Sequence, residues 1–245
     1  MIWNTETEFV QAFTSSIMRD LKGNSLSIHI WRELATGYGR PDVVAVDYEP
    51  RVFQDRPIYG TTFMRRPSLS KEAAFIVSYL VRRRWVRIET LANCLYRSVR
   101  RYIEELSSRE LIVVEDDRVR LRPIRDILAI KRIRLFEAKL HQWRQGAEQA
   151  ERNLWFTNES YILMPPKSQR SVSSMSSECA RRGIGLGFYD SDSGFQTVLK
   201  PAKSGFLSSP LVWMLNERLW EGHNDRGFLC DDSNSTSRIS PTADS

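Results

Sequence analysis

Apolar residues near the start of the chain recur at intervals of three and four. They are Phe9, Val10, Phe13, Ile17 and Leu21. This spacing predicts an amphipathic helix over residues 5–21. Residues 25–34 alternate instead, and the apolar run at residues 43–46 is bounded by glycine and proline on one side and by Pro50 on the other. Both segments are predicted strands, which the glycine-containing turn at residues 37–40 joins as a hairpin.

Arginines alternate with apolar residues at the start of residues 131–139. This period of two favours a strand that ends near Lys139 and is followed by a helix over residues 141–155. The alternative is one continuous helix over residues 136–156, because the residues from Phe136 onward are strong helix formers. The choice matters because Glu137 and Lys139 share one face of a strand but diverge on the surface of a helix.

The rest of the second half of the chain alternates between strand and helix patterns. A strand at residues 160–165, a serine-rich helix ending at Gly183 and a strand at residues 184–189 predict a right-handed crossover between parallel strands. Residues 211–220 are expected to form a last amphipathic helix. Residues 223–245 are rich in Ser, Asp, Asn and Thr and are expected to be disordered.

A different pattern lies between the two halves. Three prolines without periodicity mark a connector, after which three helical patterns precede two short alternating segments that predict a β-hairpin. We therefore expect an inserted domain. The predicted organisation is a core in two parts at residues 1–50 and 124–222, a connector at 51–68, an inserted domain at 69–123 and a tail at 223–245.

The positive charge of the chain belongs to one segment. The net charge is +6 with a pI of about 9.4. Residues 70–134 carry 16 Lys and Arg against nine Asp and Glu, a balance of +7 that accounts for all of the excess. A local basic excess is typical of a module that neutralises phosphates, and a solvated charged surface is the alternative.

Composition excludes several classes of protein. No apolar stretch is long enough for a membrane span, and the first 20 residues mix charged and apolar residues without a secretory signal pattern. The three cysteines lack zinc-binding spacing and are widely separated, which favours a reducing compartment and a cytoplasmic location. The three histidines are also isolated, so we expect them to be structural or exposed.

Candidate chemistry gathers at the ends of two predicted strands. Asp42 begins the apolar run, whereas Glu137 and Lys139 come almost a hundred residues later. Two carboxylates at neighbouring strand ends can hold magnesium, and a lysine beside them can orient or deprotonate a water for phosphodiester hydrolysis. Glu33 is a second candidate carboxylate. Glu8 lies beside the apolar stripe of the first helix, where it either turns inward or remains an exposed first-turn acid.

Pro41-Asp42 followed by Glu137-x-Lys139 resembles the PD-(D/E)xK nuclease superfamily. The resemblance implies a restriction-endonuclease-like α/β fold, with a mixed β-sheet flanked by helices, and a Mg²⁺ or Mn²⁺ cofactor. It also implies that Asp42 and Glu137 are metal ligands, that Lys139 acts on the water and that Glu8 joins the site. Many members carry a glutamine with a tyrosine four residues later; Gln149 matches, and Asn153 stands at the tyrosine position.

The predicted insert, three helices followed by a hairpin, resembles a winged helix-turn-helix domain of the α+β class. The resemblance implies that its third helix lies in the major groove of DNA and that the hairpin, or wing, adds further contacts. The implied DNA-binding residues are Arg97, Ser98, Arg100 and Arg101 of the helix and Arg118, Arg120 and Arg122 of the wing. Pairing of Arg100 with Glu104 and of Arg101 with Glu105 on a solvated helix is the alternative, and many winged helices bind proteins.

Together these patterns predict a Mg-dependent DNA endonuclease in which the insert positions double-stranded DNA. Cutting both strands would suit a two-fold homodimer. Two other functions fit the same patterns. One is a DNA-binding regulator whose nuclease-like core is inactive, and the other is a protein-interaction adaptor of a defence or mobile-element system. Salt dependence separates DNA binding from apolar protein contact, because only the former weakens steeply as salt rises.

Overall fold

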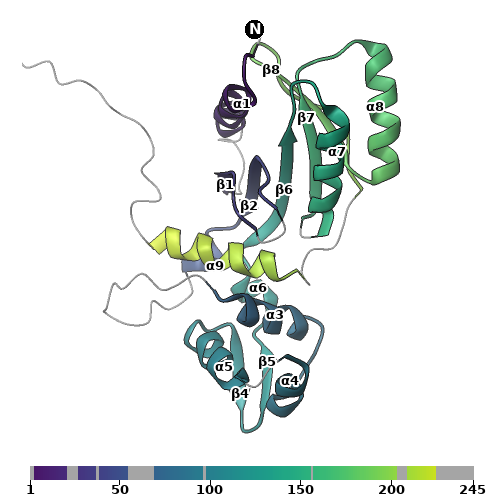
Figure 1. Ribbon diagram of the computed structural model, residues 1–245. Coiled ribbons are helices and arrows are strands. Elements are labelled where there is room, and N and C mark those ends of the chain that lie inside the picture. The colour runs from purple at the N-terminus through teal and green to yellow at the C-terminus, as the bar shows by residue number, and fades with distance from the viewer. Residues whose placement is uncertain are drawn as a thin grey trace, which may run out of the picture.

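The computed structural model describes residues 3–20, 27–36, 39–54, 69–95, 98–155, 157–202 and 209–224. Within these ranges the chain forms a six-stranded sheet in the order β1-β2-β6-β7-β8-β9 and a separate three-stranded sheet (Figure 1). The larger sheet is mixed: β6, β7 and β8 are parallel to one another, and the other neighbours are antiparallel. Its strands are β1 (Ser27–Arg32), β2 (Val43–Tyr48), β6 (Ile130–Ala138), β7 (Glu159–Met164), β8 (Gly185–Asp190) and β9 (Gly194–Leu199).

Helices cover both faces of this sheet (Figure 1). On one face α1 (Glu6–Asp20) buries its apolar stripe, including Phe9 and Phe13, against Phe136 and Ala138 of β6. On the other face lie α7 (Trp143–Arg152), which continues into the 3₁₀ turn η1 (Asn153–Trp155), and α8 (Gln169–Arg182). The predicted α/β class, with a mixed sheet flanked by helices, is therefore confirmed.

The segment that could have been either strand or helix is a strand. β6 lies between β2 and β7 and is buried on both faces, with Leu135 on one and Phe136 on the other. The strand ends at Ala138, and α7 starts five residues later. Packing on both faces outweighs the helix propensity of Glu, Ala and Lys, which amounts to only a few tenths of a kcal/mol per residue, about 0.7 at most. The predicted hairpin of β1 and β2 and the parallel crossover from β7 to β8 through α8 are also present.

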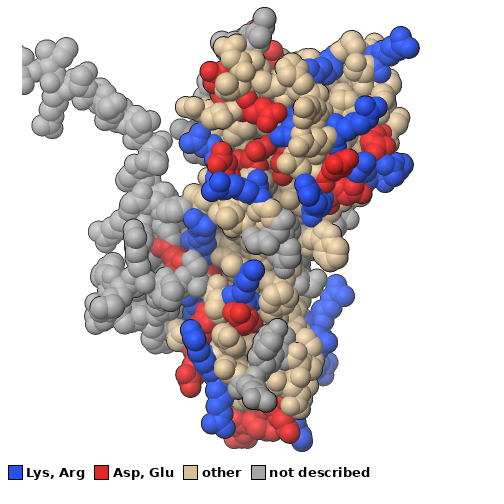
Figure 2. Space-filling view, in the orientation of Figure 1, with Lys and Arg blue, Asp and Glu red and all other residues tan. Residues whose placement is uncertain are grey.

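The insert contains the three predicted helices and the predicted hairpin. The helices are α3 (Lys71–Leu80), α4 (Ile88–Leu95) and α5 (Val99–Ser108), and the hairpin is formed by β4 (Ile112–Glu115) and β5 (Arg118–Leu121). A two-residue strand, β3 (Val86–Arg87), pairs with β5 and was not predicted. The turn between β4 and β5 is acidic, and Asp and Glu atoms gather at that end of the molecule (Figures 1 and 2). The assignment as a winged helix-turn-helix stays a prediction, as do the domain boundaries.

The last described helix, α9 (Pro210–Asn224), lies between the large sheet and the insert (Figure 1). It buries Val212 and Trp213 in one apolar cluster that also contains Leu135 of the sheet and Leu80 of α3. Two short helices, α2 (Arg51–Gln54) and α6 (Ile124–Ile127), accompany the two passages of the chain between core and insert. The core and the insert therefore share one apolar interior. Most of the predicted connector and tail, residues 55–68 and 225–245, lies outside the described ranges.

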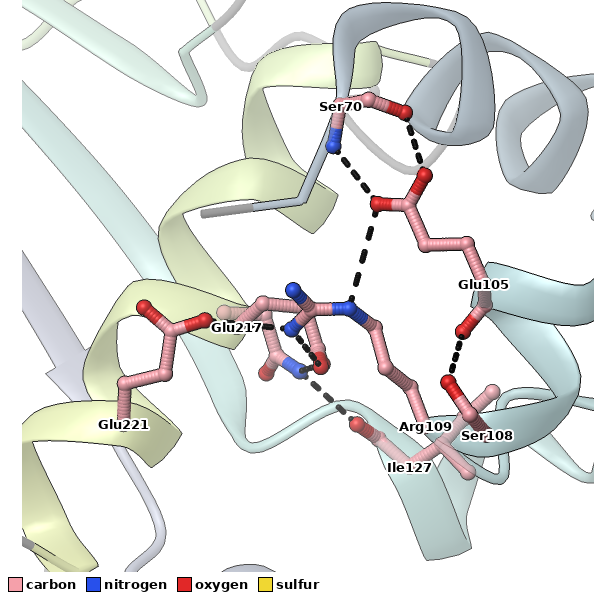
Figure 3. Close-up of polar contacts among 8 residues, drawn as sticks. Ser70, Glu105, Ser108, Arg109, Ile127, Glu217 and Glu221 are labelled. Atoms are coloured by element: carbon pink, nitrogen blue, oxygen red, sulfur yellow. Dashed lines mark hydrogen bonds and ion pairs between the residues drawn. The ribbon is translucent and has the colours of Figure 1, made fainter. Parts of the chain in front are cut away.

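A buried polar network fixes α9 to the insert (Figure 3). The guanidinium of Arg109, just after α5, is only 3% exposed and donates from Nη1 to Glu221 Oε1 at 3.1 Å. The same Nη1 lies 3.5 Å from Glu217 Oε2, and Nε lies 3.9 Å from Glu105 Oε1. Glu105 in turn accepts hydrogen bonds from the backbone N–H and the hydroxyl of Ser70, at the start of α3. One cation thus joins three elements far apart in sequence.

None of the helices in the described ranges is both long enough and apolar enough to cross a bilayer. The longest of them, α1 and α9, have 15 residues each. A helical span needs about 20 apolar residues.

Candidate active site

Asp42, directly before β2, lies level with Glu137 of the neighbouring antiparallel strand β6. Val43 of β2 is opposite Phe136 of β6, so the next residue toward the strand ends is Asp42 on one side and Glu137 on the other. A hydrogen bond of 2.8 Å from the backbone N–H of Ala138 to Asp42 Oδ2 fixes the aspartate there. Although Asp42 and Glu137 are 95 residues apart in sequence, the hairpin register brings them to one end of the sheet.

Glu137 and Lys139 lie on the same face of β6, as its period of two requires. Both side chains are largely buried. Glu137 Oε1 accepts a hydrogen bond of 2.6 Å from the side-chain amide of Asn153. Lys139 Nζ donates to Glu6 Oε2 at 3.1 Å, and its backbone N–H continues the pairing with β7 through Leu163 O. Each of these two side chains therefore has a fixed protein partner.

Two partly or fully buried carboxyl groups, those of Asp42 and Glu137, dominate the electrostatics of the site. Burial raises the pKa of Glu137 to about 7; the nearby Asp42 charge adds to this rise, while the Asn153 hydrogen bond and Lys139 oppose it. Burial also raises the pKa of Asp42, against the lowering effects of the Ala138 N–H and Lys139. Two carboxylates that resist ionisation so close together would be stabilised in their charged form by a bound cation.

One face of α7 covers this row of side chains. Gly146 leaves room for Lys139, because a Cβ at residue 146 would lie 2.7 Å from Lys139 Cγ. Asn153, seven residues later, contacts Glu137. Gln149 lies between them on the same helix face, by its spacings of three and four. Its Oε1 is buried and has no hydrogen-bond partner.

The donor set fits a hard divalent cation. Asp42 and Glu137 supply the carboxylate oxygens that Mg²⁺ and Mn²⁺ prefer, and the buried Gln149 Oε1 is an acceptor without a protein donor. In the part of the chain that the structure describes, no three Asp, Glu, His or Cys side chains are already gathered at metal-binding distance. The two carboxylates are therefore the residues that would hold an ion, with water completing its coordination.

A groove of about 680 Å³ opens beside Asp42, between α1 and the β1–β2 edge. Its charged lining residues are Glu6, Glu33, Asp42 and Arg32, and Trp31 adds an aromatic surface. Glu33 has a left-handed backbone conformation, with φ of 50°, and its carboxylate pairs with Arg40 at 3.8 Å. Glu33 is thus on the groove wall, as a second carboxylate near Asp42. Because acids outnumber bases here, the groove as it stands repels a phosphate backbone.

Glu8 does not contact Lys139, and the acid of α1 that does is Glu6. Glu8 is exposed and accepts a hydrogen bond of 3.2 Å from the backbone N–H of Asn4, while its own N–H donates to Thr5 Oγ1. The expectation that Glu8 joins the site is therefore corrected to Glu6. The sequence held a signal for this: Thr5-x-x-Glu8 is a helix-capping pattern, in which the glutamate turns back to the helix start.

The second half of α7 and the residue after it place two polar side chains over the site. Gln149 lies on the helix face between Gly146 and Asn153, and its role stays a prediction; Asn153, for which the sequence indicated no role, contacts Glu137. The signal that could have found Asn153 is its position, four residues after a candidate site glutamine and hence on the same helix face.

The predicted DNA-binding helix is α5. Arg100 and Arg101 are exposed, opposite the buried Val99 and Leu106, and within the described ranges neither makes an ion pair. The alternative pairing of Arg101 with Glu105 is absent, because Glu105 bonds Ser70 instead. Ser98 is also exposed. Arg97 lies outside the described residues.

The hairpin is less suited to DNA than expected. Arg118 is exposed, but Arg120 lies over the Trp85 ring at 5.0 Å and Arg122 donates to Glu110 at 3.1 Å. The exposed tip of the hairpin carries three acids, Glu115 at the end of β4 and Asp116 and Asp117 in the turn. Figure 2 shows this acidic end of the molecule. Phosphates would be repelled by the turn, so helix α5 is the better candidate for the DNA contact.

Comparison with known proteins gives no match by family model, by curated sequence or by solved structure.

Proposed function

We propose that the protein is a metal-dependent endonuclease that hydrolyses DNA phosphodiester bonds. The observation that carries the proposal is the pair formed by Asp42 and Glu137 on neighbouring strands, with Lys139 next on the same face. Both carboxyl groups have a raised pKa, so they form a site where a cation would be favoured. The resemblance to PD-(D/E)xK nucleases, carried by the same three residues, also supports the proposal.

Each residue then has a defined task. Mg²⁺, or Mn²⁺, supplies a polarised water and positive charge beside the phosphate when it is bound. Asp42 and Glu137 are the residues that would hold the ion. Lys139 donates hydrogen bonds toward the water or the phosphate and offsets the negative charge that develops during attack. Gln149 offers its unpartnered Oε1 to orient the attacking water.

The DNA substrate is proposed to be double-stranded and to be held by the insert. Exposed Arg100 and Arg101 on α5 supply phosphate contacts, which position a duplex without reading its sequence. The resemblance of this module to a winged helix-turn-helix supports that arrangement. Cleavage of both strands would take two sites, which a two-fold dimer of this chain would provide.

The test is cleavage of supercoiled plasmid and of single-stranded DNA in Mg²⁺ or Mn²⁺. Asp42→Asn is the sharpest variant, because asparagine keeps an oxygen to accept the Ala138 N–H but removes the charge. Asp42→Asn and Lys139→Gln, made as two separate variants, should each lower the cleavage rate about 100-fold or more. Asp126→Asn, at an exposed acid of α6, is the matched control. Undiminished cutting by both site variants would refute the assigned site.

A second candidate function is a DNA-binding regulator, or a protein-interaction adaptor, whose nuclease-like core does not turn over. It is favoured by the ion pair of Lys139 with Glu6, which occupies the lysine in the absence of substrate. Binding that weakens steeply with salt, with no cutting of any substrate, would support the regulator. Salt-insensitive association with a protein would support the adaptor.

A further inference from the structure

The contact between Asn153 and Glu137 is the tightest side-chain link from α7 to the candidate site. The amide Nδ2 donates to Glu137 Oε1 at 2.6 Å, and both residues are about 95% buried, at 4% and 5% exposure. Asn153 follows the last residue of α7, where its backbone N–H donates back to Ala150 O. Glu137 is held on both sides by β2 and β7. The hydrogen bond thus joins two rigid elements.

Helix capping does not explain this buried amide. Asparagine is favoured just beyond helix ends mainly because it tolerates the left-handed conformation. Asn153 has φ of −73° and ψ of −14°, which is right-handed helical and open to almost any residue. Its backbone bonds are made by the N–H and need no particular side chain. The partner of the side chain, Glu137, is therefore the reason that we assign to it.

We propose that Asn153 is a positioning residue that fixes the Glu137 carboxylate for metal binding. A carboxylate has two oxygens, and the amide engages one of them, Oε1, so Glu137 would still offer an oxygen to a cation. A glutamate side chain has three rotatable bonds, so without this donor it would sample several orientations. Because the hydrogen bond already holds the Glu137 carboxylate in one orientation, less side-chain entropy is lost when the ion binds.

The same helix face explains why an asparagine can do this. Gly146 lets Lys139 pass close to α7, so the helix lies near the sheet at this end. From position 153 a short amide is then long enough to contact Glu137. The resemblance to the nuclease superfamily places a tyrosine here, and the shorter side chain is a feature of this chain's own geometry.

The inference rests on the proposed function only in taking Glu137 as a metal ligand, and a direct binding measurement tests it without turnover. Calorimetric titration with Mn²⁺ would compare the parent with Asn153→Leu, which keeps the branching at Cγ but removes the donor. We expect Mn²⁺ to bind 10- to 100-fold more weakly, the loss typical when a partner of a metal ligand is removed. Gln145→Leu, at an exposed residue of the same helix, is the matched control and should bind as the parent does.

Asn153→Ser is the second variant, since serine fits any site that asparagine does but is too short to contact Glu137. It should show the same loss of affinity while keeping the parent's circular dichroism. In cleavage assays both variants should need 10- to 100-fold more Mg²⁺ for half the maximal rate, with the rate at saturation near that of the parent. A merely structural role would instead lower the rate at every Mg²⁺ concentration.

The outcomes separate the two proposals. Parent-like Mn²⁺ affinity in both Asn153 variants would overturn the positioning role and leave the nuclease intact. If the parent binds no divalent cation, the metal site proposed above fails, and the positioning role fails with it. Weaker binding in both variants, with Gln145→Leu unchanged, supports the assignment.

Discussion

The carboxylate of Asp42 accepts a hydrogen bond of 2.8 Å from the backbone N–H of Ala138, the residue between Glu137 and Lys139. The bond aligns two distant segments of the chain and also completes the strand pairing at the end of β6. Asp42 therefore has two tasks, one as a hydrogen-bond acceptor and one as a charge. Different substitutions can separate them.

Asp42→Asn and Asp42→Ala should both abolish metal-dependent cleavage but should differ in stability. Asparagine still accepts the Ala138 N–H, whereas alanine leaves the N–H of the buried Ala138 without its partner. The free energy of unfolding should then fall by about 1–3 kcal/mol in Asp42→Ala and by much less in Asp42→Asn. Urea denaturation with chelator present measures both, and equal losses of stability would contradict the assigned hydrogen bond.

Glu137→Gln should stabilise the metal-free protein at neutral pH while it destroys activity. Burial raises the pKa of Glu137 from 4.5 to about 7, so between these values the folded protein binds a proton that the unfolded chain does not. The contribution of Glu137 to the free energy of unfolding is therefore fully present below about pH 4.5 and is lost as the pH rises to about 7. The free energy of unfolding falls by roughly 3 kcal/mol over this range.

The measurement is urea unfolding of parent and Glu137→Gln at pH 4.5 and pH 7.5 in chelator. Glutamine keeps an oxygen to accept the Asn153 amide but carries no charge. The two proteins should have similar stability at pH 4.5, and the variant should be the more stable at pH 7.5. A parent whose stability does not fall over this range relative to the variant would show that Glu137 is ionised in the fold at little cost.

Glu6→Gln should lower cleavage about tenfold, whereas Glu8→Gln should leave it unchanged. Glu6 pairs with Lys139 at 3.1 Å, and partners of site residues typically matter by tenfold or more. The pair is half-exposed at Glu6, so its effect on stability should be below about 1 kcal/mol. Equal effects on cleavage from both substitutions would contradict the assignment of Glu6.

Arg109→Met should destabilise the whole protein by about 3–5 kcal/mol, because it removes a buried cation that lies 3.5 Å from the fully buried Glu217. Arg100→Met, at an exposed arginine nine residues earlier, is the control and should change stability by less than about 0.5 kcal/mol. Since core and insert share one apolar interior, both should unfold in a single transition in the parent. Two separate transitions in the parent would refute that coupling.

Arg100→Gln with Arg101→Gln should weaken DNA binding and reduce the slope of log affinity against log salt by about 2, one for each lost phosphate contact. Arg122→Gln should change the slope less, because that guanidinium already pairs with Glu110. Fluorescence anisotropy over a range of salt concentrations measures the slopes. A larger effect from Arg122→Gln would assign the DNA contact to the hairpin.

Local patterns predicted the elements of the fold well and the contacts of the site only in part. The alternation in β6 was enough to choose a strand over a helix, and the short turn after β1 was enough to predict the hairpin. Glu8 was the predicted acid of the first helix because it lies beside the apolar stripe, but its side chain turns back and accepts the Asn4 N–H. The capping pattern at Thr5 was the local signal for that conformation.

Long-range contacts escaped prediction for a different reason. Asn153 meets Glu137 only because α7 folds back over β6, and Arg109 meets Glu217 across 108 residues of chain. No local spacing in the sequence predicts such a long-range contact. A strand is indicated by its alternating residues, but no local pattern indicates which of many arginines is buried.

Helix α9 has a consequence for how the chain is made. Its Trp213 completes an interior to which the sheet and the insert both contribute, yet it is the last described element to leave the ribosome. Until then the apolar surface of α3 lacks the helix against which it packs. Newly synthesised chains should therefore pass through a partly folded state that is prone to aggregate, and chaperones would recognise it through that surface.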